Sequence, residues 1–354
     1  MKRGKKLLPA WLLIAIDLVI IAVYTAGFYQ FYYLTPRQLE SSGIKTGQNN
    51  SDTTEPDGTG TTEPEAELPQ NTADEGNETD TANQSQDTVV NTDNAEDLRL
   101  KFAKHFTDTI VSTENSYTSP DIAIQINKYT EGEGGNIVTY YVADIYLADI
   151  ACLQSGFADN TYGIGYAEDL LDMDENLGAI LAINGDYYGN GSKGVVIRNG
   201  EVYRKENGDS DVCVLFYDGT MKTYTAEQFD VDTVIANGAY QAWSFGPRLL
   251  DEESNRINSF TINSHIREEN PRTAIGYYEP GHYAFIVVDG RQSGYSYGLT
   301  LTRFSELFEK LGCKAAYNLD GGKTSEMTFQ DALVNRPAGG GREVSDCIII
   351  KEVR

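Results

Sequence analysis

The order of apolar and polar residues divides this chain of 354 residues into four parts. A short basic tail occupies residues 1–6, and a nearly unbroken apolar run follows over residues 7–34. Residues 35–95 are polar and acidic, whereas residues 96–354 carry apolar positions in short, regular patterns. The pattern predicts a cytoplasmic tail, a transmembrane anchor, a disordered linker and one folded domain, in that order.

The folded part combines strand patterns with a few helices. Alternating apolar residues predict strands over 121–129 and 138–147, joined as a hairpin, and Asn199-Gly200 and Asp218-Gly219 are typical two-residue hairpin turns. Between Thr300, a candidate cap, and Gly312, apolar residues recur at helical spacing. We therefore expect an α+β fold, with a single domain around a mixed, largely hairpin-built β-sheet and a few flanking helices.

The flanks of the apolar run predict its orientation. Lys2, Arg3, Lys5 and Lys6 precede it and acidic residues follow it, which places the N-terminus inside and the folded domain outside the cell membrane. A cleaved signal peptide is the alternative. The run is long for a signal peptide and shows no small-x-small cleavage site, which favours an uncleaved signal anchor of a single-pass protein.

Charge narrows the range of partners. The formal net charge is -25, and residues 40–98 hold fifteen acidic residues against one basic residue, Lys45. Nucleic acid is excluded as a partner because it would need a basic face. With so few apolar residues the linker cannot form a core, and its self-repulsion predicts an extended spacer.

Four polar clusters follow or begin predicted core strands. Each has a structural interpretation as a turn, a salt bridge or a cap, but together they predict a ligand site at strand ends. The clusters are Asn184-Gly185-Asp186; Arg272-Thr273; Asp289-Gly290-Arg291 with Ser293 and Gly294; and Asn318-Leu319-Asp320-Gly321-Gly322 with Thr324 and Ser325.

These clusters lie in segments that resemble a known family. INGDYYG, GVVIRNGEVY, FGPRLLDE, PRTAIGYYE, IVVDGRQSGYSYGLTL, LGCKAAYNLDGGKTSEM and LVNRPAGGGREVSDCIII are similar, in order, to the phosphodiester glycosidase domain. This is the family of the lysosomal enzyme that uncovers mannose 6-phosphate by removing N-acetylglucosamine. The resemblance covers residues 120–352 and implies hydrolysis of a sugar-1-phosphodiester at the anomeric carbon–oxygen bond.

The implied chemistry assigns candidate roles to the clusters. Arg272 and Arg291 are candidates to hold the phosphate, because guanidinium groups grip phosphate through paired hydrogen bonds. Asp289 and Asp320 are candidates for base or nucleophile. The candidates for binding the substrate, or for completing an anion pocket, are Asn184, Gly185, Asp186, Thr273, Ser293, Gly294, Asn318, Gly321, Gly322, Thr324 and Ser325.

Other cofactor motifs fail. The three histidines form no zinc or triad pattern, and the Asp172-x-Asp174-x-Asn176 stretch lacks the glycine and the last carboxylate of a calcium loop. No cofactor is required, and a calcium ion held by acidic loops stays open. Cys313 and Cys347 are the preferred pair if the four cysteines form disulfides, with buried free thiols as the alternative.

The sequence thus predicts an outward-facing glycosidase that acts on sugar phosphates or glycans of the cell envelope. A non-catalytic envelope module that binds anionic polysaccharide, or assists exopolysaccharide assembly, is the competing hypothesis. A structural partner for another membrane protein is a third, because Asp17 lies within the apolar run.

Overall fold

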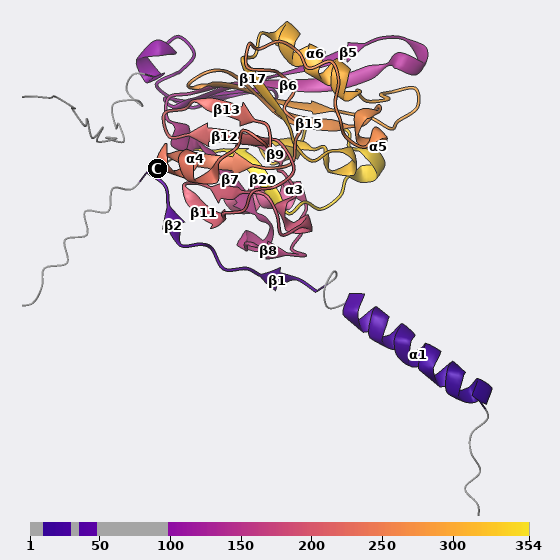
Figure 1. The fold of residues 1–354 in the computed structure, drawn as a ribbon. Coiled ribbons are helices and arrows are strands. Elements are labelled where there is room, and N and C mark those ends of the chain that lie inside the picture. Colours follow the sequence, from indigo (N-terminus) through magenta and orange to yellow (C-terminus); the bar gives the residue numbers. More distant parts are fainter. Residues whose placement is uncertain (1–9, 30–34, 48–97, 354) are drawn as a thin grey trace, which may run out of the picture. The chain divides into compact units, whose positions relative to one another are not determined.

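The computed structural model describes residues 10–29, 35–47 and 98–353 (Figure 1). Its first element is helix α1 (Ala10–Tyr29). Among the described residues, no helix combines the length and apolar content needed to cross a membrane. The structure therefore gives no support to the anchor predicted over 7–34, of which residues 7–9 and 30–34 lie outside the described part. The tail predicted over 1–6 lies outside it as well.

Three large sheets and one two-stranded sheet, rather than the single mixed sheet predicted, are present in the described residues, and every strand pair there is antiparallel. The seven-stranded sheet has the order β17 (Ala315–Asn318), β15 (Arg272–Glu279), β16 (His282–Val288), β6 (Val138–Leu147), β5 (Ile122–Glu131), β4 (Ser116–Thr118) and β3 (Val111–Ser112). The five-stranded sheet has the order β19 (Ala332–Leu333), β18 (Met327–Phe329), β9 (Leu181–Asn184), β20 (Asp346–Ile350) and β7 (Leu153–Phe157).

The six-stranded sheet contains the turns that the sequence predicted. Its order is β13 (Met221–Tyr224), β12 (Val212–Phe216), β14 (Ala239–Trp243), β10 (Val196–Arg198), β11 (Glu201–Arg204) and β2 (Ile44–Lys45). Asn199 and Gly200, both at positive φ, join β10 to β11, and Gly219 at positive φ turns β12 into β13. The predicted hairpins of β5 with β6 and of β15 with β16 are present as well.

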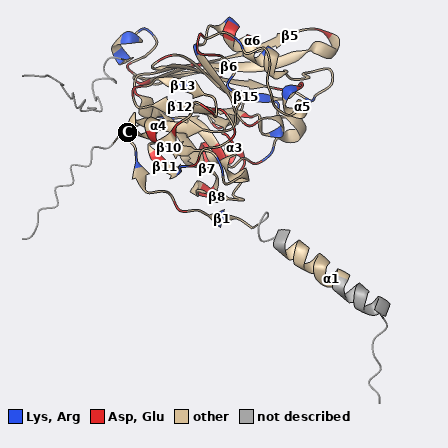
Figure 2. Cartoon of the chain, in the orientation of Figure 1, with Lys and Arg blue, Asp and Glu red and all other residues tan. Residues whose placement is uncertain are grey.

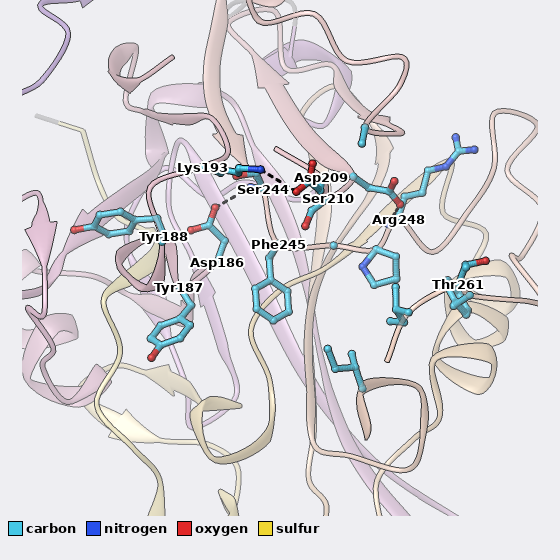
Figure 3. Close-up of a pocket in the computed structure, with 18 of the residues that line it drawn as sticks. Asp186, Tyr187, Tyr188, Lys193, Asp209, Ser210, Ser244, Phe245, Arg248 and Thr261 are labelled. Carbon is cyan, nitrogen blue, oxygen red and sulfur yellow. Dashed lines mark hydrogen bonds and ion pairs between the residues drawn. The ribbon is translucent and has the colours of Figure 1, made fainter. Parts of the chain in front are cut away.

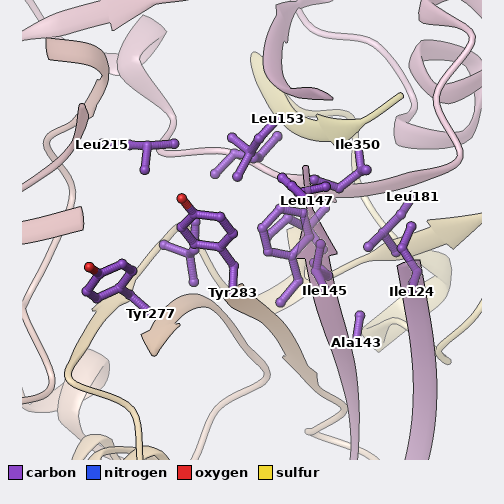
Figure 4. Packing of buried hydrophobic residues seen from close by; sticks show 14 of the residues in the cluster. Ile124, Ala143, Ile145, Leu147, Leu153, Leu181, Leu215, Tyr277, Tyr283 and Ile350 are labelled. Carbon is purple, nitrogen blue, oxygen red and sulfur yellow. The ribbon is translucent and has the colours of Figure 1, made fainter. Parts of the chain in front are cut away.

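The central core lies where the three sheets meet (Figure 4). Tyr141, Ala143 and Ile145 of β6 point into it together with Leu181 of β9 and Leu215 of β12. Alternate residues of β6, such as Val142, face the opposite side, where α6 (Leu301–Leu311) covers the sheet. Period-two alternation in the strand thus separates two hydrophobic layers.

Each large sheet carries one helix on its outer face. The α6 stripe of Leu301, Phe304 and Phe308 packs on the seven-stranded sheet, with Thr300 capping the first turn and Gly312 ending the helix in the left-handed conformation. Helix α4 (Val231–Ala236) packs on the six-stranded sheet, and α3 (Leu170–Leu177) packs on the five-stranded sheet. A single turn of helix, α5 (Ser264–Arg267), precedes β15.

Residues 35–47 differ from the disordered linker predicted over 35–95. Strand β1 (Arg37–Gln38) pairs with β8 (Gly163–Ile164), and β2 pairs with β11. We call residues 35–47 the strap. The buried Thr46 hydroxyl donates to the carbonyl oxygens of Gly200 and Ala239. Other side chains of the strap contact the domain too, since the Ser42 hydroxyl donates to the Val202 carbonyl oxygen and Lys45 pairs with Glu201. Residues 48–97, which include the rest of the predicted linker, lie outside the described part.

The four cysteines are buried and free. The preferred pairing of Cys313 with Cys347 is therefore wrong. Cys313 lies in the layer under α6, whereas Cys347 lies in β20 under α3, so two different sheets hold them. Burial raises the pKa of the Cys313 thiol to about 12.

Candidate active site

The predicted clusters meet because antiparallel pairing brings their strand ends to one edge. In the register of the seven-stranded sheet, Arg272 at the start of β15 lies opposite Val288 at the end of β16, and Ala274 lies opposite Asn318 at the end of β17. The residues that follow β16 and β17 therefore lie beside the residues that begin β15.

Asn184 joins the five-stranded sheet to this edge. Its Nδ2 donates to the carbonyl oxygen of Asp320 at 2.8 Å, and its Oδ1 accepts from the Thr273 hydroxyl at 2.6 Å. Both side chains are buried. The structure therefore assigns Asn184 and Thr273 to holding the strand ends together and places neither against the cavity described next.

A small cavity of about 120 Å³ lies at this edge, and we call it the arginine cavity. Its lining includes six of the predicted residues together with Phe245, Ile266 and Asn270, which the sequence analysis missed. The predicted residues in it are Arg272, Arg291, Asn318, Asp320, Gly321 and Gly322. Figure 2 shows basic residues around the neighbouring α5.

Arg272 is a buried guanidinium without a carboxylate partner among the described residues. Its Nε donates to the Leu299 carbonyl oxygen at 2.9 Å, and its Nη2 donates to the carbonyl oxygens of Ile266 and Glu268 at 2.6 Å each. Burial, and then the charge of Arg291, lower the pKa of Arg272 to about 10. A cation fixed by neutral carbonyl groups beside a cavity keeps its charge available for an anion.

Arg291 approaches the same cavity from the loop after β16. It has a positive φ of 57°, and Asn270 holds it, since Asn270 Oδ1 accepts from Arg291 Nη2 at 2.7 Å. Its guanidinium packs against Gly322, where an added Cβ would lie 3.1 Å from Nη1. Glycine at this position therefore gives the guanidinium room beside the turn.

Asp320 is the carboxylate of the arginine cavity. Its Oδ1 accepts from the Gly321 N–H at 2.9 Å, and its Oδ2 accepts from the Thr324 hydroxyl at 2.8 Å and lies 3.3 Å from Arg342 Nη2. Burial raises the pKa of Asp320, while these donors and the Arg342 charge oppose the rise. Asp320 is thus held in one orientation and keeps contact with the cavity.

Asp289 does not reach the arginine cavity, although the sequence paired it with Asp320. Its side chain is buried and accepts hydrogen bonds from the Asn335 amide and the Tyr295 hydroxyl, both at 2.8 Å, and from the Arg336 N–H. These donors occupy both carboxylate oxygens. Asp289 therefore joins the loop after β16 to residues 335–336.

Asp186 belongs to a buried ion cluster instead. Arg198 Nη2 donates to Asp186 Oδ1 at 2.8 Å and to Asp346 Oδ2 at 2.9 Å, and the Ser244 N–H donates to Asp186 Oδ2. Burial, and then the Asp186 charge, raise the pKa of Asp346 to about 7. Gly185 packs tightly on this cluster, since an added Cβ would lie 2.4 Å from Asp346 Cγ.

The other predicted binding residues separate into three groups. Asn318 lines the arginine cavity with a buried Oδ1 that has no hydrogen-bond partner in the described residues, and the Ser325 hydroxyl is buried and unpartnered in the same sense. Ser293 and Gly294 are exposed on the loop after β16 and do not line the cavity. The Gly321 and Gly322 amides already donate to Asp320 and to the Pro271 carbonyl oxygen, so the expected anion pocket of amides is absent there.

We next consider whether side chains of the described residues could hold a metal ion. The described residues contain no group of three or more His, Cys, Asp or Glu side chains placed to hold a metal ion. The calcium ion left open by the sequence stays a prediction.

Comparison with known proteins gives a family for this region. Residues 177–351 match the model of the phosphodiester glycosidase family, and every predicted site residue falls within them. An uncharacterized SPbeta prophage-derived protein of Bacillus subtilis, YomE, is 32% identical over 196 residues, which are 53% of this chain and 30% of that protein. The chain thus spans about a third of the length of this curated relative.

Two solved structures share the fold. One is the zebrafish N-acetylglucosamine-1-phosphodiester alpha-N-acetylglucosaminidase catalytic domain, auto-inhibited by its pro-peptide, with a TM-score of 0.52 and 18% identity over 66% of this chain and 85% of that one. The other is a hypothetical protein from Synechocystis, with a TM-score of 0.50 and 14% identity over 66% of this chain and 62% of that one.

Proposed function

Because residues 177–351 form a phosphodiester glycosidase domain, we propose that the chain hydrolyses a sugar-1-phosphodiester at the anomeric carbon–oxygen bond. The observation that carries the proposal is the buried Arg272 guanidinium, which lines the arginine cavity with Arg291 and has no carboxylate partner among the described residues. Two guanidinium groups beside one small cavity favour a phosphate ligand.

Arg272 and Arg291 stabilise the phosphate leaving group. A phosphate monoester has a second pKa of about 6, so it leaves far more readily than an alcohol and needs no strong general acid. Arg272 and Arg291 neutralise the charge that grows on the phosphate oxygen as the bond breaks. Arg272 is fixed by three carbonyl groups and Arg291 by Asn270, so neither guanidinium has to reorganise during the reaction.

Asp320 acts as the general base for the attacking water. The water oxygen bonds to the anomeric carbon, its proton passes to the Asp320 carboxylate, and the electron pair of the broken bond leaves on the phosphate oxygen. Thr324 and the Gly321 N–H hold the carboxylate in place for this role.

The prediction that tests this function concerns Arg291. The full chain should release N-acetylglucosamine from its methyl 1-phosphodiester, followed by mass spectrometry, and Arg291→Ala should lower kcat/KM by about two to three orders of magnitude, as loss of one group stabilising developing charge does. Arg303→Ala, on α6 outside the cavity, is the matched control and should keep the rate.

Near-normal turnover by a folded Arg291→Ala protein would remove this residue from the reaction. Binding of anionic polysaccharide without any turnover by the unaltered chain would favour the non-catalytic module. A location outside the cell, with envelope glycans as substrate, rests on the N-terminal sequence pattern alone and stays a prediction.

A further inference from the structure

Four exposed cations near the arginine cavity make no ion pair among the described residues. We call them the basic surface, and they are Lys128, Arg291, Lys323 and Arg336. In a second cavity of about 610 Å³, which shares Phe245 with the arginine cavity, Lys193 is by contrast paired with Asp209 at 3.2 Å (Figure 3). On a chain with a formal net charge of -25, unpaired cations gathered in one place indicate a surface for an anionic partner.

The loop after β16 connects two of these cations. Arg291, near its start, lines the arginine cavity. Gln292 donates from Nε2 to the main-chain carbonyl oxygen of Arg336 at 2.7 Å, which holds residue 336 beside this loop. The Arg336 guanidinium lies over the ring of Tyr295, on the same loop, with Cζ 5.0 Å from the ring centroid. The basic surface therefore starts at the arginine cavity and continues along the loop.

The two lysines extend this surface. Lys128, on β5, lies over the same Tyr295 ring, with Nζ 5.8 Å from the ring centroid. Lys323 directly follows Gly322, which lines the arginine cavity. The Lys323 side chain packs over Gly339, where an added Cβ would lie 3.3 Å from Lys323 Cε. All four cations thus lie on loops that border the arginine cavity or on the strand that contacts those loops.

A buried carboxylate holds the basic surface together. Asp289 accepts hydrogen bonds from the Tyr295 hydroxyl and from the Arg336 N–H, so it fixes both the ring and the residue whose guanidinium lies over it. The Asn335 amide donates to it as well, and the carboxylate is buried. Asp289 therefore offers no accessible oxygen to the cations of the basic surface, and it acts as a positioning residue for them.

This arrangement suits a molecule with several anionic groups. Lys128, Lys323 and Arg336 do not line the arginine cavity, so a phosphate held there leaves these three cations available. Further anionic groups of the same molecule would match them in charge. Arginine forms paired hydrogen bonds with phosphate, and lysine attracts it as a point charge. Continuity with the arginine cavity favours phosphate as the repeated group.

We infer that the basic surface binds a linear chain of repeated phosphodiesters, one of which enters the arginine cavity. The substrate class is then a polymer with phosphates in its backbone, and an isolated sugar phosphodiester uses only part of the available contacts. This inference rests on the proposed function for the phosphate in the arginine cavity, but binding of the chain can be measured without hydrolysis.

The test removes two cations that lie outside the arginine cavity. Lys128→Gln combined with Arg336→Gln takes two positive charges from the basic surface at exposed positions, and Lys323→Gln is a second, independent variant. Lys104→Gln combined with Lys222→Gln is the matched control, because it also removes two exposed cations that form no ion pair in the described part of the chain. Thermal unfolding of the full-length variants confirms that each is folded.

The probe is synthetic poly(glycerol phosphate), which repeats phosphodiesters and contains no sugar that could be hydrolysed. Calorimetric titration at several salt concentrations measures its binding. We expect the unaltered chain and the control to bind it, and the affinity to fall about ten-fold or more in the double variant of the basic surface. The dependence of affinity on salt should also become shallower there, because each lost phosphate contact releases fewer counterions. Lys323→Gln should weaken binding in the same direction.

Four results would contradict this expectation. Equal affinity in the double variant and the control, or no binding of poly(glycerol phosphate) by the unaltered chain, would overturn the basic surface as a binding site. Equally tight binding of poly-L-glutamate would overturn the choice of phosphate. Binding to phosphatidylglycerol vesicles without binding to the polymer would assign the surface to a membrane instead.

The proposed reaction is tested separately. Binding of the polymer through the basic surface, with no hydrolysis of the methyl 1-phosphodiester of N-acetylglucosamine, would overturn the reaction and leave the surface standing. Hydrolysis of that diester without binding of the polymer would support the reaction and overturn the surface.

Discussion

At the scale of single residues, the two aspartates that the sequence placed together have opposite environments. Asp320 keeps contact with the arginine cavity, whereas buried donors occupy both oxygens of Asp289. Both groups have a raised pKa because of burial, so the pKa alone does not separate a reacting carboxylate from a structural one. Access to the cavity is what separates them.

This contrast predicts opposite outcomes for two matched substitutions. Asp320→Asn should lower kcat/KM by about two to four orders of magnitude, as loss of a general base does. Asp289→Asn should lower the unfolding free energy by about 1–3 kcal/mol, because an amide cannot accept from all the buried donors. Steady-state kinetics and urea unfolding of both variants check the pair.

If Asp289→Asn kept its stability and lost activity while Asp320→Asn kept its activity, the assignment of the two carboxylates would be reversed. The sequence alone could not have separated them, because both precede a glycine and follow a core strand. The difference lies in Asn335 and Tyr295, which reach Asp289 from other loops.

At the scale of elements, the strap is the largest departure from the sequence analysis. It is polar, with Leu39 and Ile44 as its large apolar residues, and its two strands are only two residues long each. Main-chain pairing with β8 and β11 attaches the strap to the domain, and side chains of Ser42, Lys45 and Thr46 add contacts. Thr46 is the buried one of these three, and its hydroxyl donates to two carbonyl groups.

Replacing that hydroxyl tests whether the strap belongs to the domain. Thr46→Val keeps the shape but leaves the carbonyl oxygens of Gly200 and Ala239 without this donor, so the unfolding free energy should fall by about 1–3 kcal/mol. Thr109→Val, at an exposed position, is the control. Urea unfolding of the full chain measures the difference, and equal stability of the two variants would show that the Thr46 hydroxyl contributes nothing.

Elements with strong local signals were predicted well, and the others were not. The turns at Asn199-Gly200 and Asp218-Gly219, and the capped helix α6, match the structure because the residues themselves favour those conformations. Strands β7 and β14 were not predicted, and the division into three sheets depends on contacts between distant segments that no local pattern records. Arg342, which reaches Asp320 from a glycine-rich loop, was missed for the same reason.

At the scale of the whole molecule, a buried acid in α3, Asp174, makes the unfolding free energy depend on pH. Asp174 is fully buried, and its carboxyl group has no basic partner among the described residues. Burial raises the pKa of Asp174 from 3.8 to about 6. The folded state therefore binds this proton more tightly than the unfolded state, and stability falls as the pH rises from about 4 to about 6.

Removing the charge of Asp174 should restore the unfolding free energy that is lost as the pH rises. Asp174→Asn should raise the unfolding free energy at pH 7.5 by on the order of 3 kcal/mol, since one pKa unit corresponds to about 1.4 kcal/mol, and should change it little near pH 4. Urea unfolding of the full chain at both values checks the sign. A gain at pH 4 equal to that at pH 7.5 would mean that the effect comes from packing.

The attachment of the strap to the domain also bears on the spacer role that the sequence predicts for the acidic segment. If residues 35–47 are tied to β8 and β11, only residues 30–34 separate α1 from the folded domain along the chain. In the sequence, residues 48–97 then form an insertion between β2 and residue 98. Shortening or lengthening that insertion would alter the entropy of closing a loop, and the reach between α1 and the domain would stay the same.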